Sequence, residues 1–189
     1  MRKLALILGI LFTVPLLAPA QKKEKPPINE RIFFGGMFAL QIGTYTAIEV
    51  SPLVGYRLTP RLSLAAGIKY EYLNNKQTGF SFSTHIYGFR SFARYHIIPN
   101  LAELLGGGIN LGLFAQLEYE GLSLERQYFD YPAYPSDGRF WLSSVLIGGG
   151  ISVPTGPRGA VNFSILYNLN ESANSIYYNN PIIRFGFNF

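Results

Sequence analysis

Large apolar residues alternate with small or polar residues along most of this chain, and a period of two is typical of β-strands. The clearest case is the C-terminal segment, whose odd-numbered positions carry bulky apolar side chains, namely Ile183, Phe185, Phe187 and Phe189. An apolar strand of this kind at a free sheet edge invites aggregation in water. The pattern therefore favours a strand that closes a barrel inside a membrane.

Seven earlier segments alternate in the same way, and none shows helical periodicity. They cover residues 31–43, 46–58, 61–73, 80–97, 103–119, 139–154 and 160–169. After the first hairpin, short turns at 59–61, 99–100 and 156–159 alternate with longer connections at 74–79, 120–138 and 170–180. This asymmetry is typical of bacterial outer-membrane barrels, whose periplasmic turns are short. The sequence predicts an all-β fold, an eight-stranded antiparallel up-and-down transmembrane β-barrel with both termini in the periplasm.

The N-terminal region lies outside the alternating pattern. Residues 1–20 have the features of a secretory signal peptide, because basic residues precede an apolar stretch over 4–17 and Ala18-Pro19-Ala20 fits a small-residue cleavage site. Residues 21–30 are charged and contain two prolines, so we expect a polar, extended periplasmic leader. The barrel domain then covers residues 31–189.

Composition narrows the range of partners and cofactors. Without Arg2 and Lys3 of the signal peptide, the net charge falls from +5 to +3, which gives no indication of nucleic acid. The absence of cysteine excludes disulfides and thiol chemistry. The two histidines, His85 and His96, lie about one strand length apart on the expected strand and do not form a metal pair. We therefore expect no metal and no cofactor.

Alternation alone does not tell which face of each strand points inward, because a soluble ligand-binding barrel has its apolar face inside. Small residues on the polar faces favour the membrane reading, since a narrow eight-stranded lumen needs them. Aromatic residues near the ends of the apolar faces also favour a membrane barrel, because Tyr and Trp are preferred at the membrane interface. These residues are Tyr56, Tyr70, Tyr72, Tyr95, Tyr119, Trp141 and Tyr167.

Three segments resemble the small outer-membrane β-barrel proteins of Bacteroidota-type bacteria, a porin-like or OmpA-like group. They are Glu49-Val50-Ser51-Pro52-Leu53-Val54-Gly55-Tyr56, Leu62-Ser63-Leu64-Ala65-Ala66-Gly67-Ile68-Lys69-Tyr70 and Phe92-Ala93-Arg94-Tyr95. The resemblance covers essentially the whole chain after residue 20 and implies fold and compartment rather than activity. It also implies that the aromatic ending, with Phe185, Phe187 and Phe189, is the signal read by the barrel-assembly machinery. It supplies no catalytic residue.

Charged residues gather on the faces expected to line the lumen. They are Glu49, Arg57, Lys69, Glu71, Arg90, Arg94, Glu118 and Arg184. One interpretation is a polar path for ions or small solutes, that is, a narrow pore. The other is a plug of mutually paired charges, which we favour because eight strands leave an interior just wide enough for side chains.

Two further features are candidates for function. The loop 120–138 interleaves Tyr128, Phe129, Tyr131 and Tyr134 with prolines, which is typical of a recognition surface. The alternative is a loop that folds over the barrel mouth.

Ser83 and His85 share one face, as in outer-membrane lipid A deacylases. No acidic partner is evident there, so we favour an interfacial histidine in the aromatic belt over a catalytic one.

The glycine clusters 106–108 and 148–150 are not phosphate-binding loops, because neither is followed by a helix or by Gly-Lys-Ser/Thr. Glycine within a strand instead permits curvature and close strand approach.

From these features we expect a non-enzymatic barrel with a structural or interaction role in the envelope, alone or as a subunit of a larger outer-membrane complex. Expected partners are outer-membrane lipid and proteins bound through loop 120–138 or the leader 21–30.

Overall fold

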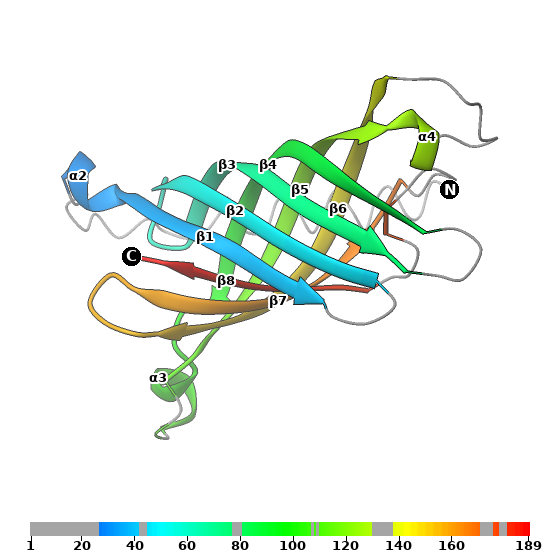
Figure 1. The fold of residues 1–189 in the computed structure, drawn as a ribbon. Helices are drawn as coiled ribbons and strands as arrows, with labels where there is room; N and C mark the ends of the chain where they lie inside the picture. The colour runs from blue at the N-terminus through cyan, green and yellow to red at the C-terminus, as the bar shows by residue number, and fades with distance from the viewer. Residues whose placement is uncertain are drawn as a thin grey trace, which may run out of the picture.

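The protein forms a closed barrel of eight antiparallel strands, each hydrogen-bonded to its neighbours in chain order (Figure 1). The structure, a computed structural model, describes residues 27–41, 45–76, 81–106, 108, 110–129, 138–170, 176–177 and 181–189. The strands are β1 (Ile32–Gln41), β2 (Tyr45–Arg57), β3 (Leu62–Asn75), β4 (Phe82–Ile98), β5 (Gly112–Glu125), β6 (Arg139–Pro154), β7 (Ala160–Asn168) and β8 (Ile182–Asn188). The predicted eight-stranded antiparallel barrel is confirmed. The expected signal peptide over 1–20 lies outside the described residues.

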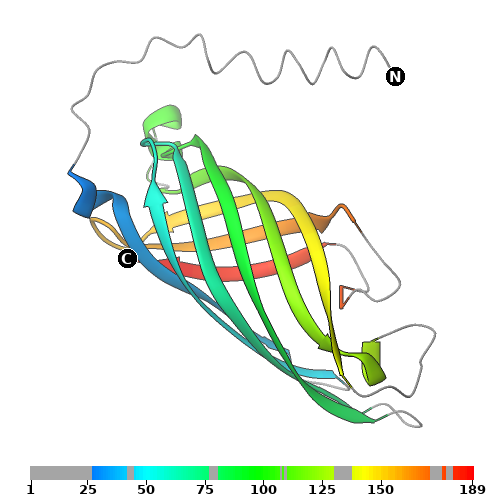
Figure 2. The ribbon, with the colours of Figure 1, turned by 90° about the horizontal axis from the view of Figure 1, so that it is seen from above.

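The barrel closes where β8 pairs with β1. Gly35 lies opposite Asn188 in this seam, and Phe34 and Phe189 exchange two backbone hydrogen bonds of 3.1 and 2.8 Å. Phe185, Phe187 and Phe189 all face outward on this last strand. The start of β1 and the end of β8 lie at one end of the barrel, which we call the terminal end (Figure 2). We call the opposite end the far end.

In the described part of the chain, three short helices interrupt the predicted all-strand pattern: α2 (Ile28–Arg31), α3 (Leu101–Leu105) and α4 (Arg126–Phe129). The expectation that the leader is extended is therefore wrong over its last residues, where α2 forms. Each helix has five residues or fewer, too few for an apolar periodicity to appear in the sequence. No helix in the described part of the chain is long and apolar enough to cross a membrane.

The expected strand over 103–119 is displaced, because β5 runs from Gly112 to Glu125. The predicted tight turn at 99–100 is also wrong, since the connection from β4 to β5 covers residues 99–111 and contains α3. Asn100 accepts a hydrogen bond of 3.0 Å from the Ala102 backbone amide at the start of α3. Gly106, with a φ of 67°, ends the helix in the left-handed conformation that glycine adopts without strain.

The outer face of the barrel carries a band of large, exposed apolar side chains. Phe34, Phe38, Val50, Val54, Ile68, Phe89, Leu117, Trp141, Ile147, Ile165 and Ile183 are all more than one-third exposed. These residues occupy the positions predicted to be outside. Neighbouring positions on the same strands are buried, as with Arg90 beside Phe89 and Arg184 beside Ile183. The period of two therefore sorts apolar side chains outward and most polar ones inward.

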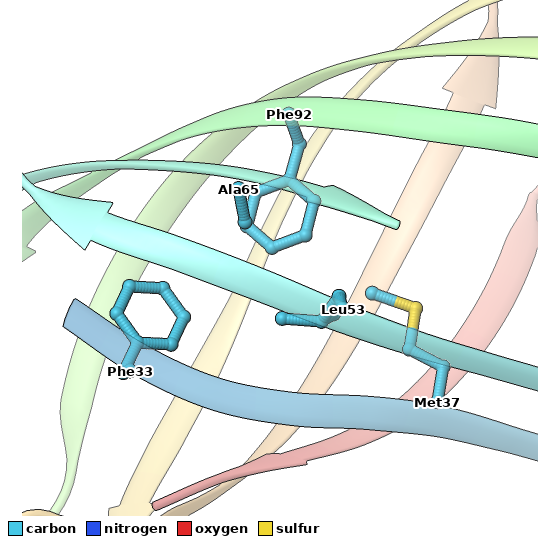
Figure 3. Close-up of a cluster of buried hydrophobic side chains, with 5 residues drawn as sticks. All are labelled: Phe33, Met37, Leu53, Ala65 and Phe92. Carbon is cyan, nitrogen blue, oxygen red and sulfur yellow. The ribbon is translucent and has the colours of Figure 1, made fainter. Parts of the chain in front are cut away.

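The interior is less uniformly small and polar than predicted. At the terminal end, Phe33, Met37, Leu53, Ala65 and Phe92 form a buried apolar cluster (Figure 3). Towards the far end, a second cluster contains Ile86, Leu122, Leu124 and Phe129. Large apolar side chains therefore fill the barrel on both sides of its centre, towards the terminal end and towards the far end. Unpaired charges would be costly to bury in these two layers. The buried ion pairs lie in the middle layer between the two clusters.

Candidate functional site

The centre of the lumen holds a network of paired charges from five strands, β2, β3, β4, β5 and β8. Lys69 on β3 has its Nζ 3.1 Å from a Glu49 carboxylate oxygen on β2 and 3.1 Å from a Glu71 carboxylate oxygen. The Lys69 side chain is fully buried. Glu49 and Glu71 are slightly exposed, so this pair of carboxylates neutralises a cation that has almost no access to water.

Two arginines connect this group to β5. The Arg90 guanidinium lies 2.6 Å from Glu49, 2.8 Å from Glu120 and 3.6 Å from Glu118. Arg184 on β8 lies 2.8 Å from Glu118 and 2.9 Å from Glu120. Each buried carboxylate on β5 is thus shared between two guanidinium groups. The shortest of these contacts, Arg90 with Glu49 and Glu120 and Arg184 with Glu118, are charge-assisted hydrogen bonds, the stronger class in proteins.

Tyr177 joins the network from the connection between β7 and β8. Its hydroxyl donates to the Glu120 carboxylate and accepts from Lys69 Nζ at 3.2 Å and Arg184 Nη2 at 3.0 Å. Sequence reasoning missed Tyr177, because its segment has no alternation to place it. It also missed Glu120, although Glu120 continues the even-numbered inward positions of Gln116 and Glu118. The alternation was not followed to Glu120, because the predicted strand ended at residue 119 and the predicted loop began at residue 120.

Arg94 and Arg57 were predicted to belong to the charged lumen, but the structure holds them differently. Arg94 Nε and Nη2 donate to the Gln116 amide oxygen at 2.9 and 2.8 Å, and Gln116 Nε2 donates to Glu118 at 2.7 Å. Arg94 thus touches the network only through a neutral amide. Arg57 lies apart at the terminal end, where its guanidinium is 5.2 Å from the Phe33 ring centroid.

The network is close to neutral. Its four carboxylates are Glu49, Glu71, Glu118 and Glu120, and its four cations are Lys69, Arg90, Arg184 and the amide-linked Arg94. Buried ions are tolerated when they are paired and hydrogen-bonded. Such an arrangement fixes side chains across the lumen and fills it. Among the described residues, no group of three or more His, Asp or Glu side chains could hold a metal ion.

The far end of the barrel is covered by part of the predicted recognition loop. Residues 120–125 belong to β5, so the predicted bounds 120–138 are wrong at the start. The Tyr128 ring stacks on Phe82 with centroids 4.4 Å apart, and buried Phe129 meets the same ring edge-on at 6.0 Å. These two aromatics therefore pack over the mouth. Tyr131 and Tyr134 lie outside the described residues.

Ser83 and His85 lie on the outer face of β4, where His85 is surrounded by aromatic side chains. Both side chains are exposed on the outside of β4, and His85 Nδ1 is 2.9 Å from the Tyr70 hydroxyl. The His85 ring also stacks on Tyr70 and lies 5.4 Å from the Tyr72 centroid. The hydrogen-bond partner found for the His85 imidazole is thus the phenol of Tyr70. A histidine that activates a serine is instead oriented by a carboxylate.

Comparison with known proteins supports the fold. No family model matches the chain, and no curated protein matches it in sequence. Among solved structures, it is similar to the crystal structure of the N-terminal beta-barrel domain of Pseudomonas aeruginosa OprF. The match covers 85% of this chain and 96% of that chain, with 14% identity and a TM-score of 0.50. At this identity the likeness is one of fold.

Proposed function

We propose that this protein is a non-enzymatic barrel of the bacterial outer membrane whose lumen is filled by side chains. In this proposal both termini face the periplasm, and the protein serves a structural or interaction role in the envelope, alone or as a subunit of a larger assembly. The observation that carries the proposal is the combination of a lipid-compatible outer band with a centre of paired, buried charges.

The outer band supports insertion in a membrane. Soluble monomers rarely expose a continuous apolar patch larger than a few hundred Å², whereas here every strand presents large apolar side chains outward. A closed barrel leaves no unpaired sheet edge in lipid. Tyr70, Tyr119, Trp141 and Tyr167 add exposed aromatics suited to the interface.

The interior supports a filled lumen over an open pore. Arg90, Glu118 and Glu120 have side chains with no measurable exposure, so water reaches this layer poorly. A conducting path would have to separate ion pairs that stabilise one another at low dielectric, which costs several kcal/mol. The phenol bound to His85 gives no support to a lipid-modifying activity on the Ser83 face.

Contacts with protein partners would then use the leader 21–30 or the loop 120–138. The outward row of Phe185, Phe187 and Phe189 on the closing strand is the candidate signal for the barrel-assembly machinery. The neighbouring outer surface would be occupied by outer-membrane lipid.

Trp141 gives a direct test of insertion, because it is the only tryptophan in the chain and its side chain is 64% exposed on the outer face of β6. We expect the fluorescence of the refolded protein in phospholipid vesicles to be quenched strongly by brominated acyl chains. Aqueous iodide should quench it weakly, because the indole lies in the membrane interface.

A variant with tyrosine in place of Trp141 and tryptophan in place of Phe140, which lies on the inward face of β6, is the matched control. Its fluorescence should respond far less to brominated lipid. Strong quenching by iodide together with no response to brominated lipid in the wild-type protein would overturn the membrane assignment.

A further inference from the structure

A cavity of about 330 Å³ opens into the lumen at the terminal end. We call it the vestibule. Its lining includes Arg57, Arg94, His96 and Arg158, with Phe33 and Asn162 between them. Phe33 and Phe92 of the apolar cluster in Figure 3 line its wall. Its volume falls within the range of sites that bind small molecules.

The charged side chains that line the vestibule are all cationic. Three arginines line it, and none of the described lining residues carries a carboxylate. One acidic group lies nearby: Glu30, whose carboxylate is 3.7 Å from Arg158 with both side chains about half exposed. An exposed pair at this distance contributes little and is readily exchanged for another anion.

Arg94 is the deepest of the three cations, and it reaches the nearest acid of the network, Glu118, only through Gln116. Its guanidinium donates to the neutral Gln116 amide and lies over the Phe114 ring, 4.1 Å from the centroid. Among the described residues it forms no ion pair, although the residue is only 7% exposed. The aromatic face and the amide hold the guanidinium in one orientation, which lowers the entropic cost of binding a ligand.

Arg57 is held in a similar way. Its Nη1 and Nη2 donate to the backbone carbonyls of Glu30 and Arg158, both at 3.3 Å. Carbonyl oxygens orient the guanidinium without neutralising it. Arg57 and Arg158 are therefore brought close together around one cavity, although like charges repel.

We propose that the vestibule binds a small, water-soluble oxyanion, a compound bearing a phosphate or carboxylate group. Guanidinium groups recognise both anions through paired N–H donors. A bound oxyanion would neutralise the cluster of Arg57, Arg94 and Arg158, and it would enter from the solvent at the terminal end. Arg94 connects this site to the central network through Gln116, but the site opens at the terminal end, so the proposal does not depend on the role of the filled lumen.

Isothermal titration of the full-length protein in detergent micelles tests the proposal, with inorganic phosphate in one arm and citrate in the other at constant ionic strength. We expect saturable binding in at least one arm, and the stronger arm identifies the preferred group. Replacing Arg94 with glutamine (Arg94→Gln) should weaken that binding by about tenfold or more, the equivalent of one charge-assisted hydrogen bond.

Arg158→Gln is the second variant, because the Arg158 side chain is exposed and its replacement leaves the buried interior intact. It should also weaken binding. Arg61→Gln is the matched control, because Arg61 lies at the same end and carries the same charge but does not line the vestibule. Its affinity should equal that of the wild type. Absence of saturable binding in both arms, or equal losses in Arg158→Gln and Arg61→Gln, would overturn the proposal.

Discussion

Replacing Arg90 with alanine is expected to lower the free energy of unfolding by about 3 kcal/mol. Arg90 is buried and lies within ion-pair distance of Glu49, Glu118 and Glu120. The expected loss is at the lower end of the range for breaking a buried pair, because Lys69 and Arg184 still contact these carboxylates. Denaturant unfolding of the refolded protein in micelles, followed by circular dichroism, measures it.

Two variants sharpen this prediction. Arg158→Ala breaks an exposed ion pair with Glu30 and should cost less than about 1 kcal/mol. The double variant Arg90→Ala with Glu120→Gln also removes the charge of one carboxylate that Arg90 contacts, so its loss should be smaller than the sum of the two single losses. If Arg90→Ala were as stable as Arg158→Ala, the central network would not stabilise the barrel.

Replacing Gly150 with alanine is expected to destabilise the barrel by about 3 kcal/mol, at the upper end of the range for overpacking. A Cβ atom at this position would overlap the backbone carbonyl oxygen of Phe163 on β7, and it would approach the Phe114 ring to 2.8 Å. Backbone of a paired strand yields less than a flexible side chain. The pairing of β6 with β7 would therefore have to shift.

Gly156→Ala is the matched control, because no atom lies within 4 Å of a Cβ built there and its φ is not in the left-handed region. It should leave the unfolding midpoint nearly unchanged. Equal midpoints for Gly150→Ala and Gly156→Ala would show that β6 and β7 do not approach as closely as described.

The period of two carries most of the information about this fold. It places Arg90 and Arg184 inside and Phe89 and Ile183 outside, because a side chain's face depends only on its position along the strand. The boundary of β5 escapes the same reasoning. Glycine at 121 resembles the start of a loop, yet the Phe89 ring of β4 packs where its side chain would be, and the alternation continues to Leu124.

Other parts of the site depend on tertiary contacts that no local pattern reveals. Tyr177 reaches Lys69 across a sequence separation of 108 residues. The vestibule likewise brings Arg57, at the end of β2, close to Arg158, in the turn between β6 and β7, 101 residues away. By contrast, α3 had a readable signal: Asn100 is a favoured N-cap residue and Gly106 a favoured terminator.

Conductance across a planar bilayer tests the filled-lumen barrel most directly. The refolded protein is reconstituted in vesicles, and quenching of Trp141 by brominated lipid establishes insertion before the vesicles are fused to the bilayer. Because paired charges and apolar layers occupy the interior, we expect no stable conductance above the bare bilayer. A large, long-lived conductance from inserted wild-type protein would contradict this account.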